Sequence, residues 1–587
     1  MTMPEASLRW VDVGSLAELQ AEGRLLGKVD AVPVLVVWSD GRAWAIEDRC
    51  PHLGFPLHRG SWESGLVTCH WHHARFDLTS GCTLDPWADD AHGFEVRTTG
   101  GRVAVAARPD PDPVATLRAR LERGLADDLT LVVAKSVLGL VEAGEPTEDI
   151  VAVGLAFGLA NRRAGWGAGL TVLVAMANLV GRLEPRDDVR ALALTHGLRF
   201  VADDTAGHPP RFAEPPLRPA PDRALLEAWF RRFVETRSAP AAERVLASAL
   251  DAPDGLAWAE RMLFAAVTDH LFVDEGHTLD FANKACEAGA LAGPSALTSV
   301  VVQAAAAQRS EERSAWRHPV DLVVAAGEAS ARLLAALRVD AGLDLGSNVV
   351  AAGPGVGGER VEALAWKLLD ERAAVGLDAL CREAEEGATP EELARAVVLA
   401  AGLRIVRFHT QNEQGDWDEV HHSFTHANAL HRALQRQPTG ALCRGLVAAA
   451  LRVHLDRFLN IPAARLPAGG VGDLRALAAC WERQGGVDEA GTIAAAHVRG
   501  GASPHELAHA LLEALLDEDA GFHWYQLTEA MLGQALDWPA GSEPQALLFA
   551  GLARFLAAHT PTRRETRSVF DVARRLRRGE ELFAVDG

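Results

Sequence analysis

The chain has 587 residues, with 79 acidic and 58 basic side chains and a formal net charge of −21. This length exceeds what one compact core usually holds, so we expect at least two domains. The acidic balance disfavours phosphate backbones and anionic lipid surfaces, and we therefore expect no nucleic-acid partner and no membrane partner.

Targeting and redox signals are weak. The first residues lack a basic stretch followed by an apolar core, and the longest apolar runs are shorter than a bilayer span. The seven cysteines are scattered, and their odd number fits a reducing compartment. These features predict a cytoplasmic protein.

Short strands are expected in the first hundred residues. Residues 32–46 and 93–106 each show two short runs rich in β-branched and aromatic residues around a turn that contains glycine. This pattern is typical of β-hairpins. We predict a small all-β domain over residues 1–107.

The composition changes after that domain. Residues 108–113 contain three prolines at alternate positions, which favours an extended linker. From residue 114 on, Ala, Leu, Glu and Arg recur at helical spacing. The sequence therefore predicts a multidomain protein in which a large all-α domain over residues 114–587 follows the all-β domain.

Two segments of the helical region resemble each other. Residues 387–394 and 501–508 each place a Ser or Thr before a proline, as at the start of a helix. His409 and His523 each stand nineteen residues after that proline, in a Phe-His pair. We expect stacked helical repeats, in which His409 and His523 either converge on a site or bridge helices.

One motif carries specific chemistry. Cys50, His52, Cys69 and His72 form the pattern C-x-H-x16-C-x2-H, and Gly54 allows a tight turn after the first pair. Two cysteines and two histidines can bind zinc. They fit better a Rieske [2Fe-2S] cluster, in which two thiolates hold one iron and two imidazoles hold the other.

The residues around this motif extend the pattern. Arg75-Phe-Asp77 and Gly81 follow the second pair, and strands flank both pairs. With them, residues 8–107 resemble the Rieske ferredoxin and oxygenase-ferredoxin family. The resemblance implies a cluster that carries single electrons and a reductase that donates them.

This region departs from the Rieske proteins of respiratory complexes, which carry an extra disulfide and hydroxyl groups beside the cluster. In this chain the residues at the corresponding positions look like Phe55, Trp71, Ala74 and Phe76, which have no hydroxyl groups. Without hydroxyl hydrogen bonds to the sulfurs, the reduced cluster is less stabilised. We predict a reduction potential near the low end of the Rieske range, about −150 mV.

A second metal site in the helical region is suggested by acids and histidines at helical spacing. If each set lies on one helix, its members share a face. Pairs of acid-x-x-His on separate helices resemble the ligands of diiron carboxylate bundles. The two sets are Glu419, His422 and His426, and His270, Asp274 and His277.

Two other interpretations use neighbouring residues. Asp418, His421 and His426 have the spacing that the mononuclear non-haem iron site of Rieske oxygenases uses for two of its three ligands, which a further residue completes to a triad of two histidines and one carboxylate. His505-Glu-Leu-Ala-His509 is a formal H-E-x-x-H zinc motif, but it opens a helix directly after Pro504, which favours coincidence. Chance spacing and structural roles remain the alternatives for all of these histidines.

A further resemblance concerns residues 420–430, Val-His-His-Ser-Phe-Thr-His-Ala-Asn-Ala-Leu. This segment is similar to the histidine-rich helices of questin-oxidase-like proteins, which oxygenate polyketide rings. The similarity covers little of the helical region, and no residue roles follow from it.

Two functions fit these features. The first is an oxidoreductase, an oxygenase, in which the Rieske cluster passes electrons to a mononuclear or dinuclear non-haem iron in the helical domain, where O2 and a small organic substrate meet. A homodimer would allow transfer between chains. The second is a ferredoxin-like electron carrier or redox sensor on a helical-repeat scaffold, without chemistry of its own.

Overall fold

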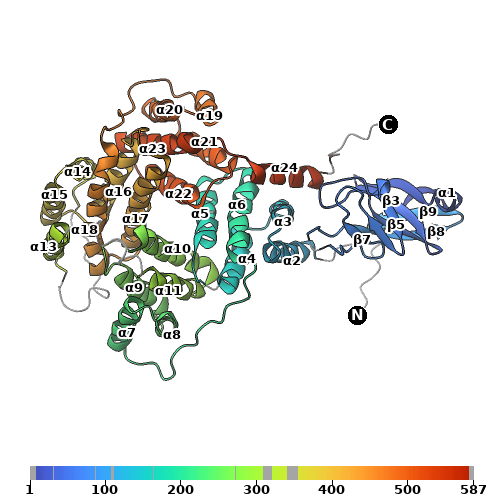
Figure 1. Cartoon of the computed structure of the whole chain (residues 1–587), viewed down its shortest axis with the longest axis horizontal. Coiled ribbons are helices and arrows are strands. Elements are labelled where there is room, and N and C mark those ends of the chain that lie inside the picture. The colour runs from blue at the N-terminus through green and yellow to red at the C-terminus, as the bar shows by residue number, and fades with distance from the viewer. Residues whose placement is uncertain are drawn as a thin grey trace. The chain divides into compact units, whose positions relative to one another are not determined.

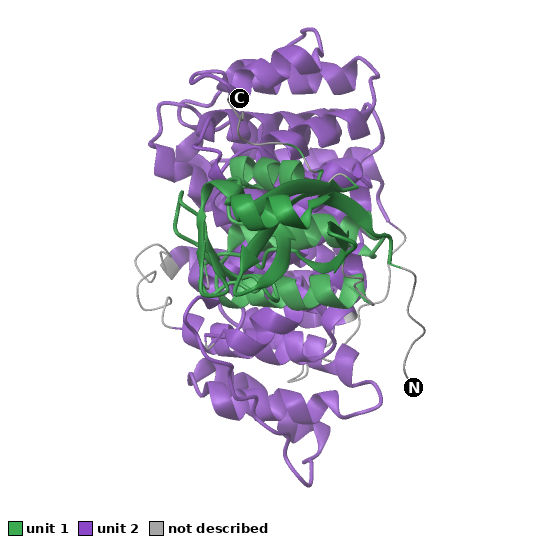
Figure 2. Ribbon diagram, turned by 90° about the vertical axis from the view of Figure 1, so that its right-hand side faces the viewer, with its two compact units in different colours: residues 1–146, 566–587 green, residues 147–565 purple. Residues whose placement is uncertain are grey.

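The computed structural model describes residues 8–578 and 580, except 31, 86, 108–111, 163, 272, 309–319 and 340–354. By its internal contacts the chain divides into two compact units. The first contains residues 1–146 and 566–587, and the second contains residues 147–565 (Figures 1 and 2). A β-rich segment is followed by a large helical region, as the sequence predicted.

Six antiparallel strands form the larger sheet of the first unit, in the spatial order β1-β9-β8-β4-β3-β2. Their bounds are β1 Val11–Ser15, β2 Arg24–Val29, β3 Val32–Ser39, β4 Arg42–Glu47, β8 Gly93–Thr99 and β9 Arg102–Ala107. Both predicted hairpins are present, because β3 pairs with β4 and β8 pairs with β9. The turn residues Asp40, Gly41, Gly100 and Gly101 all have positive φ, as a tight two-residue hairpin turn requires.

A smaller sheet contains β5 Ser61–Glu63, β6 Leu66–Thr68 and β7 Arg75–Asp77. The loop between β6 and β7 carries Cys69 and His72, and the loop after β4 carries Cys50 and His52. Helix α1 Leu16–Glu22 and the short 3-10 helix Leu57–Arg59 complete this region. Each half of the cysteine and histidine motif is therefore anchored at the end of a strand.

Strand β3 separates two apolar cores. Leu35 and Val37 pack on one side, in the same core as Cys50 and Cys69. Val34 packs on the other side, in the core beneath β8 and β9. This division follows from the alternation of side chains along a strand, and it places the motif cysteines inside a packed core.

Three helices accompany the sheets in the first unit. They are α2 Pro113–Ala126, α3 Thr130–Glu142 and α24 Glu565–Arg577, of which residues from 566 on are counted with this unit. Arg577 donates to Glu142 at 2.6 Å. The expected linker over residues 108–113 falls largely outside the described residues, and the domain boundaries drawn from the sequence stay a prediction.

The second unit is helical throughout its described residues. Its helices are α4 Thr147–Asn161, α5 Ala168–Leu183, α6 Asp187–Thr205, α7 Arg223–Glu235, α8 Ala239–Leu250, α9 Gly255–Val267, α10 His277–Ala292, α11 Ser295–Ala307, α13 Val320–Ala336, α14 Gly358–Lys367, α15 Ala373–Glu385, α16 Pro390–Val406, α17 Trp417–Arg436, α18 Gly440–Leu455, α19 Leu474–Trp481, α20 Val487–Arg499, α21 Pro504–Leu516, α22 Phe522–Leu536 and α23 Glu543–His559. Among the described helices, none is long and apolar enough to cross a bilayer.

The two similar segments do start helices. The side chain of Thr389 accepts a hydrogen bond from the backbone N–H of Glu392 at the start of α16. The side chain of Ser503 accepts one from the backbone N–H of Glu506 at the start of α21. The helices differ in length, however, so His409 follows the end of α16 while His523 is the second residue of α22. The two histidines therefore occupy different structural positions, and the helical repeat stays a prediction.

Helix α17 lies at the centre of the histidine-rich region. It packs against α10 and α22, two helices that are far apart in the sequence (Figure 1). The first residue of α10, the first turns of α17 and the start of α22 all carry histidines. This packing positions the site described below.

Candidate functional site

The loop after β4 folds around the first cysteine and histidine pair. The backbone N–H of Cys50 donates to the carbonyl of Phe55 at 2.8 Å, and the N–H of Gly54 donates back to the carbonyl of Cys50 at 2.7 Å. Gly54 has a φ of +79°, a conformation that a residue without Cβ adopts at little cost. The tight turn expected from Gly54 is therefore present.

The loop between β6 and β7 repeats this arrangement. Cys69 N–H donates to the carbonyl of Ala74 at 2.8 Å, and His73 N–H donates to the carbonyl of Cys69 at 2.9 Å. His73 occupies the position in this loop that Gly54 occupies in the first loop. Its φ is +65°, which is uncommon for a residue with a Cβ. The two loops thus hold their cysteines by the same hydrogen-bond pattern.

The four motif side chains converge. Cys50 and Cys69 are both buried, and the thiol of Cys50 interacts with the sulfur of Cys69, which lowers the pKa of Cys69 to about 6 and raises that of Cys50. The rings of His52 and His72 lie 4.7 Å apart. His52 Nδ1 is buried and has no hydrogen-bond partner within the described part of the chain.

This donor set fits a [2Fe-2S] cluster. Two adjacent thiols, one of which loses its proton easily, suit one iron, and two neighbouring imidazoles suit the other. Burial is the largest cause that lowers the pKa of His52, which keeps its nitrogen lone pairs available. The orphaned His52 Nδ1 would gain a partner from iron.

Aromatic side chains surround the two histidines. The ring of Trp71 lies 4.5 Å from that of His72, and the ring of Trp87 lies 5.1 Å from that of His52. Trp71 is 41% exposed although it is large and apolar. Phe55 packs against Trp71, so aromatic groups without hydroxyls lie beside the motif histidines.

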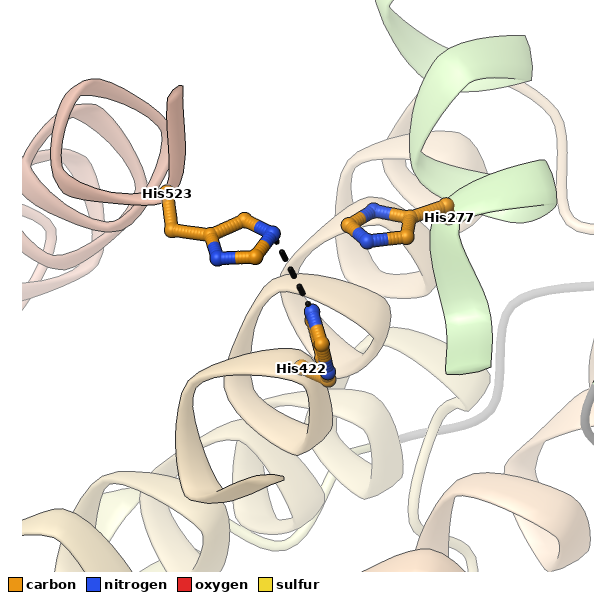
Figure 3. Close-up of side chains that lie close together, drawn as sticks. All are labelled: His277, His422 and His523. Carbon is orange, nitrogen blue, oxygen red and sulfur yellow. Dashed lines mark hydrogen bonds between the residues drawn. The ribbon is translucent and has the colours of Figure 1, made fainter. Parts of the chain in front are cut away.

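A second convergence of histidines lies in the helical unit. His277 opens α10, His422 lies in the first turns of α17, and His523 opens α22 (Figure 3). One ring nitrogen from each lies within 4.8 Å of those from the other two. Nε2 of His422 and Nε2 of His523 are 3.3 Å apart. Three helices therefore aim imidazoles at one point.

A fourth imidazole and an acid lie beside this group. The ring of His421 is 4.6 Å from that of His523 and 4.9 Å from that of His422. Asp418, His421 and His523 form a second set of potential ligand atoms, again within 4.8 Å of one another. We call His277, His421, His422 and His523 the histidine cluster.

Carboxylates lie behind two of these rings. Nδ1 of His523 lies 3.2 Å from Oδ1 of Asp418, and Nδ1 of His422 lies 3.5 Å from Oε2 of Glu275. If each Nδ1 carries the proton that its acid attracts, each Nε2 presents a lone pair. Two lone pairs would then face each other at 3.3 Å, and a cation between them would relieve the repulsion.

Three rings of the histidine cluster have lowered pKa values. Burial lowers the pKa of His277 to about 4 and is also the largest cause that lowers the pKa values of His421 and His422. Both ring nitrogens of His421 and Nδ1 of His277 have no hydrogen-bond partner among the residues described. Neutral imidazoles with unused nitrogens are the form that binds metal ions.

The backbone before His277 is strained. Asp274 and Glu275 have φ values of +54° and +55°, and Gly276 follows with +99°. These residues separate α9 from α10, so the single helical face expected for His270, Asp274 and His277 does not form. Consecutive left-handed residues are costly and persist mainly where function requires them. Here they place His277 and Glu275 at the histidine cluster.

The remaining predicted ligands lie elsewhere. His270 and His426 line a small cavity with Gly276. Asp274 accepts from Gln303 at 3.0 Å, and the pKa of Asp274 is raised by burial. His409 Nδ1 accepts from the backbone of Gln411, and Glu419 is bonded to Arg452. The structure brings His277, His422 and His523 together and leaves the other five outside the cluster.

Some residues at the two sites were not singled out from the sequence. Glu275 has no spacing relation to His422, because the contact depends on the left-handed turn. Asp418 and His421 were considered only as partners of His426, which points to the neighbouring cavity instead. A helical-wheel argument on α17 alone could not identify His523 as their partner.

Known proteins resemble the first of these regions. Residues 9–99 match the family model for the Rieske [2Fe-2S] domain, and they form such a domain in this chain. Apoptosis-inducing factor 3 of Mus musculus is 37% identical over 75 residues, which are 13% of this chain and 12% of that protein. The ferredoxin component of the alkene monooxygenase system of Xanthobacter autotrophicus is 29% identical over 105 residues, 18% of this chain and 86% of that protein.

Among solved structures, the ferredoxin of carbazole 1,9a-dioxygenase from Nocardioides aromaticivorans IC177 matches 17% of this chain and 98% of its own chain, at 26% identity and a TM-score of 0.16. The chain thus spans about an eighth of the length of apoptosis-inducing factor 3 but most of the two ferredoxins. All of these matches cover less than a fifth of the chain.

Proposed function

We propose that the protein is an oxygenase in which a Rieske cluster on Cys50, His52, Cys69 and His72 delivers electrons to a non-haem iron held by His277, His422 and His523. Electron transfer by the Rieske domain is supported by its similarity to ferredoxin components of oxygenase systems. The iron site is our inference from the geometry of the histidine cluster.

The observation that carries the proposal is the pair of Nε2 atoms 3.3 Å apart, each on a ring whose Nδ1 faces a carboxylate. A carboxylate at Nδ1 is the usual partner of a metal-bound histidine, because it fixes the tautomer that leaves Nε2 free. His277 supplies a third nitrogen within reach. In a purely structural cluster, Nδ1 of His277 and both ring nitrogens of His421 would stay buried without a hydrogen-bond partner among the described residues.

The side chains themselves have three tasks. His277, His422 and His523 hold the metal, and burial lowers the pKa values of His277 and His422, so that protons compete less for their ring nitrogens. Asp418 orients His523 through the contact at 3.2 Å, and Glu275 places a negative charge 3.5 Å from Nδ1 of His422 without forming a hydrogen bond to it. A bound iron with three protein ligands would accept electrons and leave positions open for oxygen and a small organic substrate.

Electrons have to enter and cross the molecule. We propose an electron-donating reductase as the partner of the Rieske domain, because the ferredoxin relative is named as a component of a monooxygenase system and a ferredoxin passes on electrons that it has received from a donor. Transfer to the histidine cluster requires close approach of the two sites, either within one chain or between the chains of a homodimer.

A second function is favoured by a different observation. The relatives named above cover less than a fifth of the chain, and one of them is named as a ferredoxin component and is covered over most of its length. The chain would then be an electron carrier or redox sensor whose helical unit binds a partner. In that case the histidine cluster binds no metal.

Iron counting separates the two functions. After anaerobic loading with ferrous iron we expect three irons per chain, of which two belong to the cluster. His422→Ala should reduce this to two and leave the Rieske spectrum unchanged, because it removes one of the three ligands. His409→Ala is the control, since His409 lies outside the histidine cluster, and it should keep three. Two irons in the wild-type protein would leave the electron-carrier function.

A further inference from the structure

A buried cation lies directly behind the first loop of the Rieske domain. Lys135 of α3 donates from Nζ to the carbonyl oxygen of Pro51 at 3.1 Å. Pro51 stands between Cys50 and His52, the first two proposed cluster ligands. The side chain of Lys135 is only 12% exposed, so little water lies between its charge and this loop.

An ion-pair network holds this cation in place. Lys135 Nζ lies 3.2 Å from Oδ2 of Asp89, which is itself almost fully buried. Arg120 and Arg123 approach Oδ1 of the same carboxylate at 3.3 and 2.9 Å. Arg123 also contacts Asp90 at 3.1 Å. Three cations therefore share two carboxylates, and the group keeps an excess of positive charge beside the loop.

Other charged groups near this loop are already paired. A cavity of about 600 Å³ lies beside Cys50 and Pro51, and Lys135 and Arg120 form part of its wall together with Glu47 and Arg49. Arg49 is bound to Glu47 at 2.7 Å. Lys135 is thus the cation of this group that makes direct contact with the ligand loop.

The position of Lys135 in the chain is informative. The Rieske family model ends at residue 99, and α3 begins at Thr130. Lys135 therefore belongs to a helical addition to the Rieske domain. A lysine this deeply buried is costly unless it is paired, and the ion pair with Asp89 offsets that cost where Lys135 contacts the ligand loop.

We propose that Lys135 is a positioning residue that raises the reduction potential of the [2Fe-2S] cluster. Reduction adds one negative charge to the cluster, and a fixed positive charge in a water-poor environment stabilises that form. Hydrogen bonding to the ligand loop and nearby charge are established means of tuning such centres. The inference rests on the assigned cluster ligands and is independent of a metal in the helical unit.

The effects of the charge of Lys135 and of its hydrogen bond on the reduction potential can be separated with variants of the full-length protein. Lys135→Gln removes the charge and keeps a donor, Lys135→Met removes both, and Lys135→Arg keeps the charge. Lys28 is exposed on β2 of the same unit, so Lys28→Gln is a matched control that removes one surface charge. The reduction potential is measured by optical redox titration, with cluster content checked by visible circular dichroism.

We expect Lys135→Gln and Lys135→Met to lower the equilibrium constant for reduction about tenfold, which corresponds to about 59 mV for a one-electron couple. Lys135→Arg and Lys28→Gln should each change it less than twofold. A wild-type potential in Lys135→Gln would overturn the proposal, because the charge would then have no effect.

Asp89→Asn provides a test of opposite sign that does not depend on replacing Lys135. It removes a negative charge from the same network and should raise the potential. A lowered or unchanged potential in Asp89→Asn, with the cluster intact, would contradict the proposal even if the Lys135 variants failed to bind a cluster. Iron binding at the histidine cluster is expected to stay unchanged in all of these variants.

Discussion

The cluster loops of the Rieske domain and the histidine cluster of the helical unit collect their ligands in different ways. The proposed [2Fe-2S] ligands lie between Cys50 and His72, on two loops with the same hydrogen-bond pattern. The histidine cluster takes its members from α10, α17 and α22, between His277 and His523. The first site is a local motif, whereas the second exists only after the helices have packed.

The difference also concerns charge. In the Rieske domain the proposed ligands include two thiols that would bind as anions, and a buried cation lies behind the loop. In the helical unit the protein supplies imidazoles and places carboxylates behind two of them. The negative charge at the proposed metal site would therefore come from groups behind the ligands rather than from the ligands themselves.

The comparison predicts that the two sites bind iron independently, and this gives the largest expected effect. Cys69→Ala removes a thiolate ligand and should abolish the Rieske absorption and its electron paramagnetic resonance signal completely. Ferrous binding to the histidine cluster should persist at one iron per chain, as measured by metal analysis after loading. Loss of both signals in Cys69→Ala would show that the sites are coupled and would break the comparison.

Replacing the carboxylates behind the histidines should change the metal affinity of the histidine cluster by smaller factors. Asp418→Asn weakens the partner of His523 at 3.2 Å and should reduce the metal affinity tenfold to a hundredfold, as is typical for such groups. Glu275→Gln acts over 3.5 Å and should reduce it less than tenfold. Both affinities are measured by competition with a chelator. Equal effects of the two variants would contradict the proposed tautomers.

The buried charges of the helical unit predict a pH dependence of stability. Burial raises the pKa of Asp280, on α10, from 3.8 to about 7. The folded state therefore keeps a proton that the unfolded state releases, so stability falls as the pH rises above the unfolded value and through about 7. Between pH 5 and pH 7 this loss amounts to about 2 kcal/mol.

Asp280→Asn should remove this dependence, because the amide does not ionise. The thermal midpoint of the helical circular dichroism signal, measured at pH 5 and pH 7, should then change less with pH than in the wild-type protein. An unchanged slope in the variant would mean that another group titrates.

The last prediction is a value rather than a change. Phe55, Trp71, Ala74 and Phe76 provide no hydroxyl groups to the cluster region, so the wild-type reduction potential should lie near the low end of the Rieske range, about −150 mV. Redox titration measures it directly. A value near +300 mV would show that other groups donate hydrogen bonds to the sulfurs.

Much of the first unit could be predicted from the sequence because its signals are local. The turns at Gly41 and Gly101 define hairpins, and the Cys50 and Cys69 motifs each lie within one loop. The ligand assignment itself stays a prediction, although the Rieske domain is confirmed by its family match.

The histidine cluster was harder to predict, because helical spacing shows only which residues share a face. His422 and His426 lie one turn apart on α17, yet His422 meets His277 and His523 while His426 lines a separate cavity with His270. The choice depends on where α10 and α22 cross α17 and on the left-handed turn at Asp274. No local pattern encodes that turn.

The discontinuous first unit has a consequence for synthesis. Residues 566–587 are counted with the sheets rather than with the helices that precede them, and Arg577 of α24 bonds to Glu142 of α3. A ribosome makes the chain from its N-terminus, so the cysteine loops emerge early while α24 emerges only after the whole second unit. Synthesis of the cysteine loops and completion of the unit that contains them are therefore separated in time during translation.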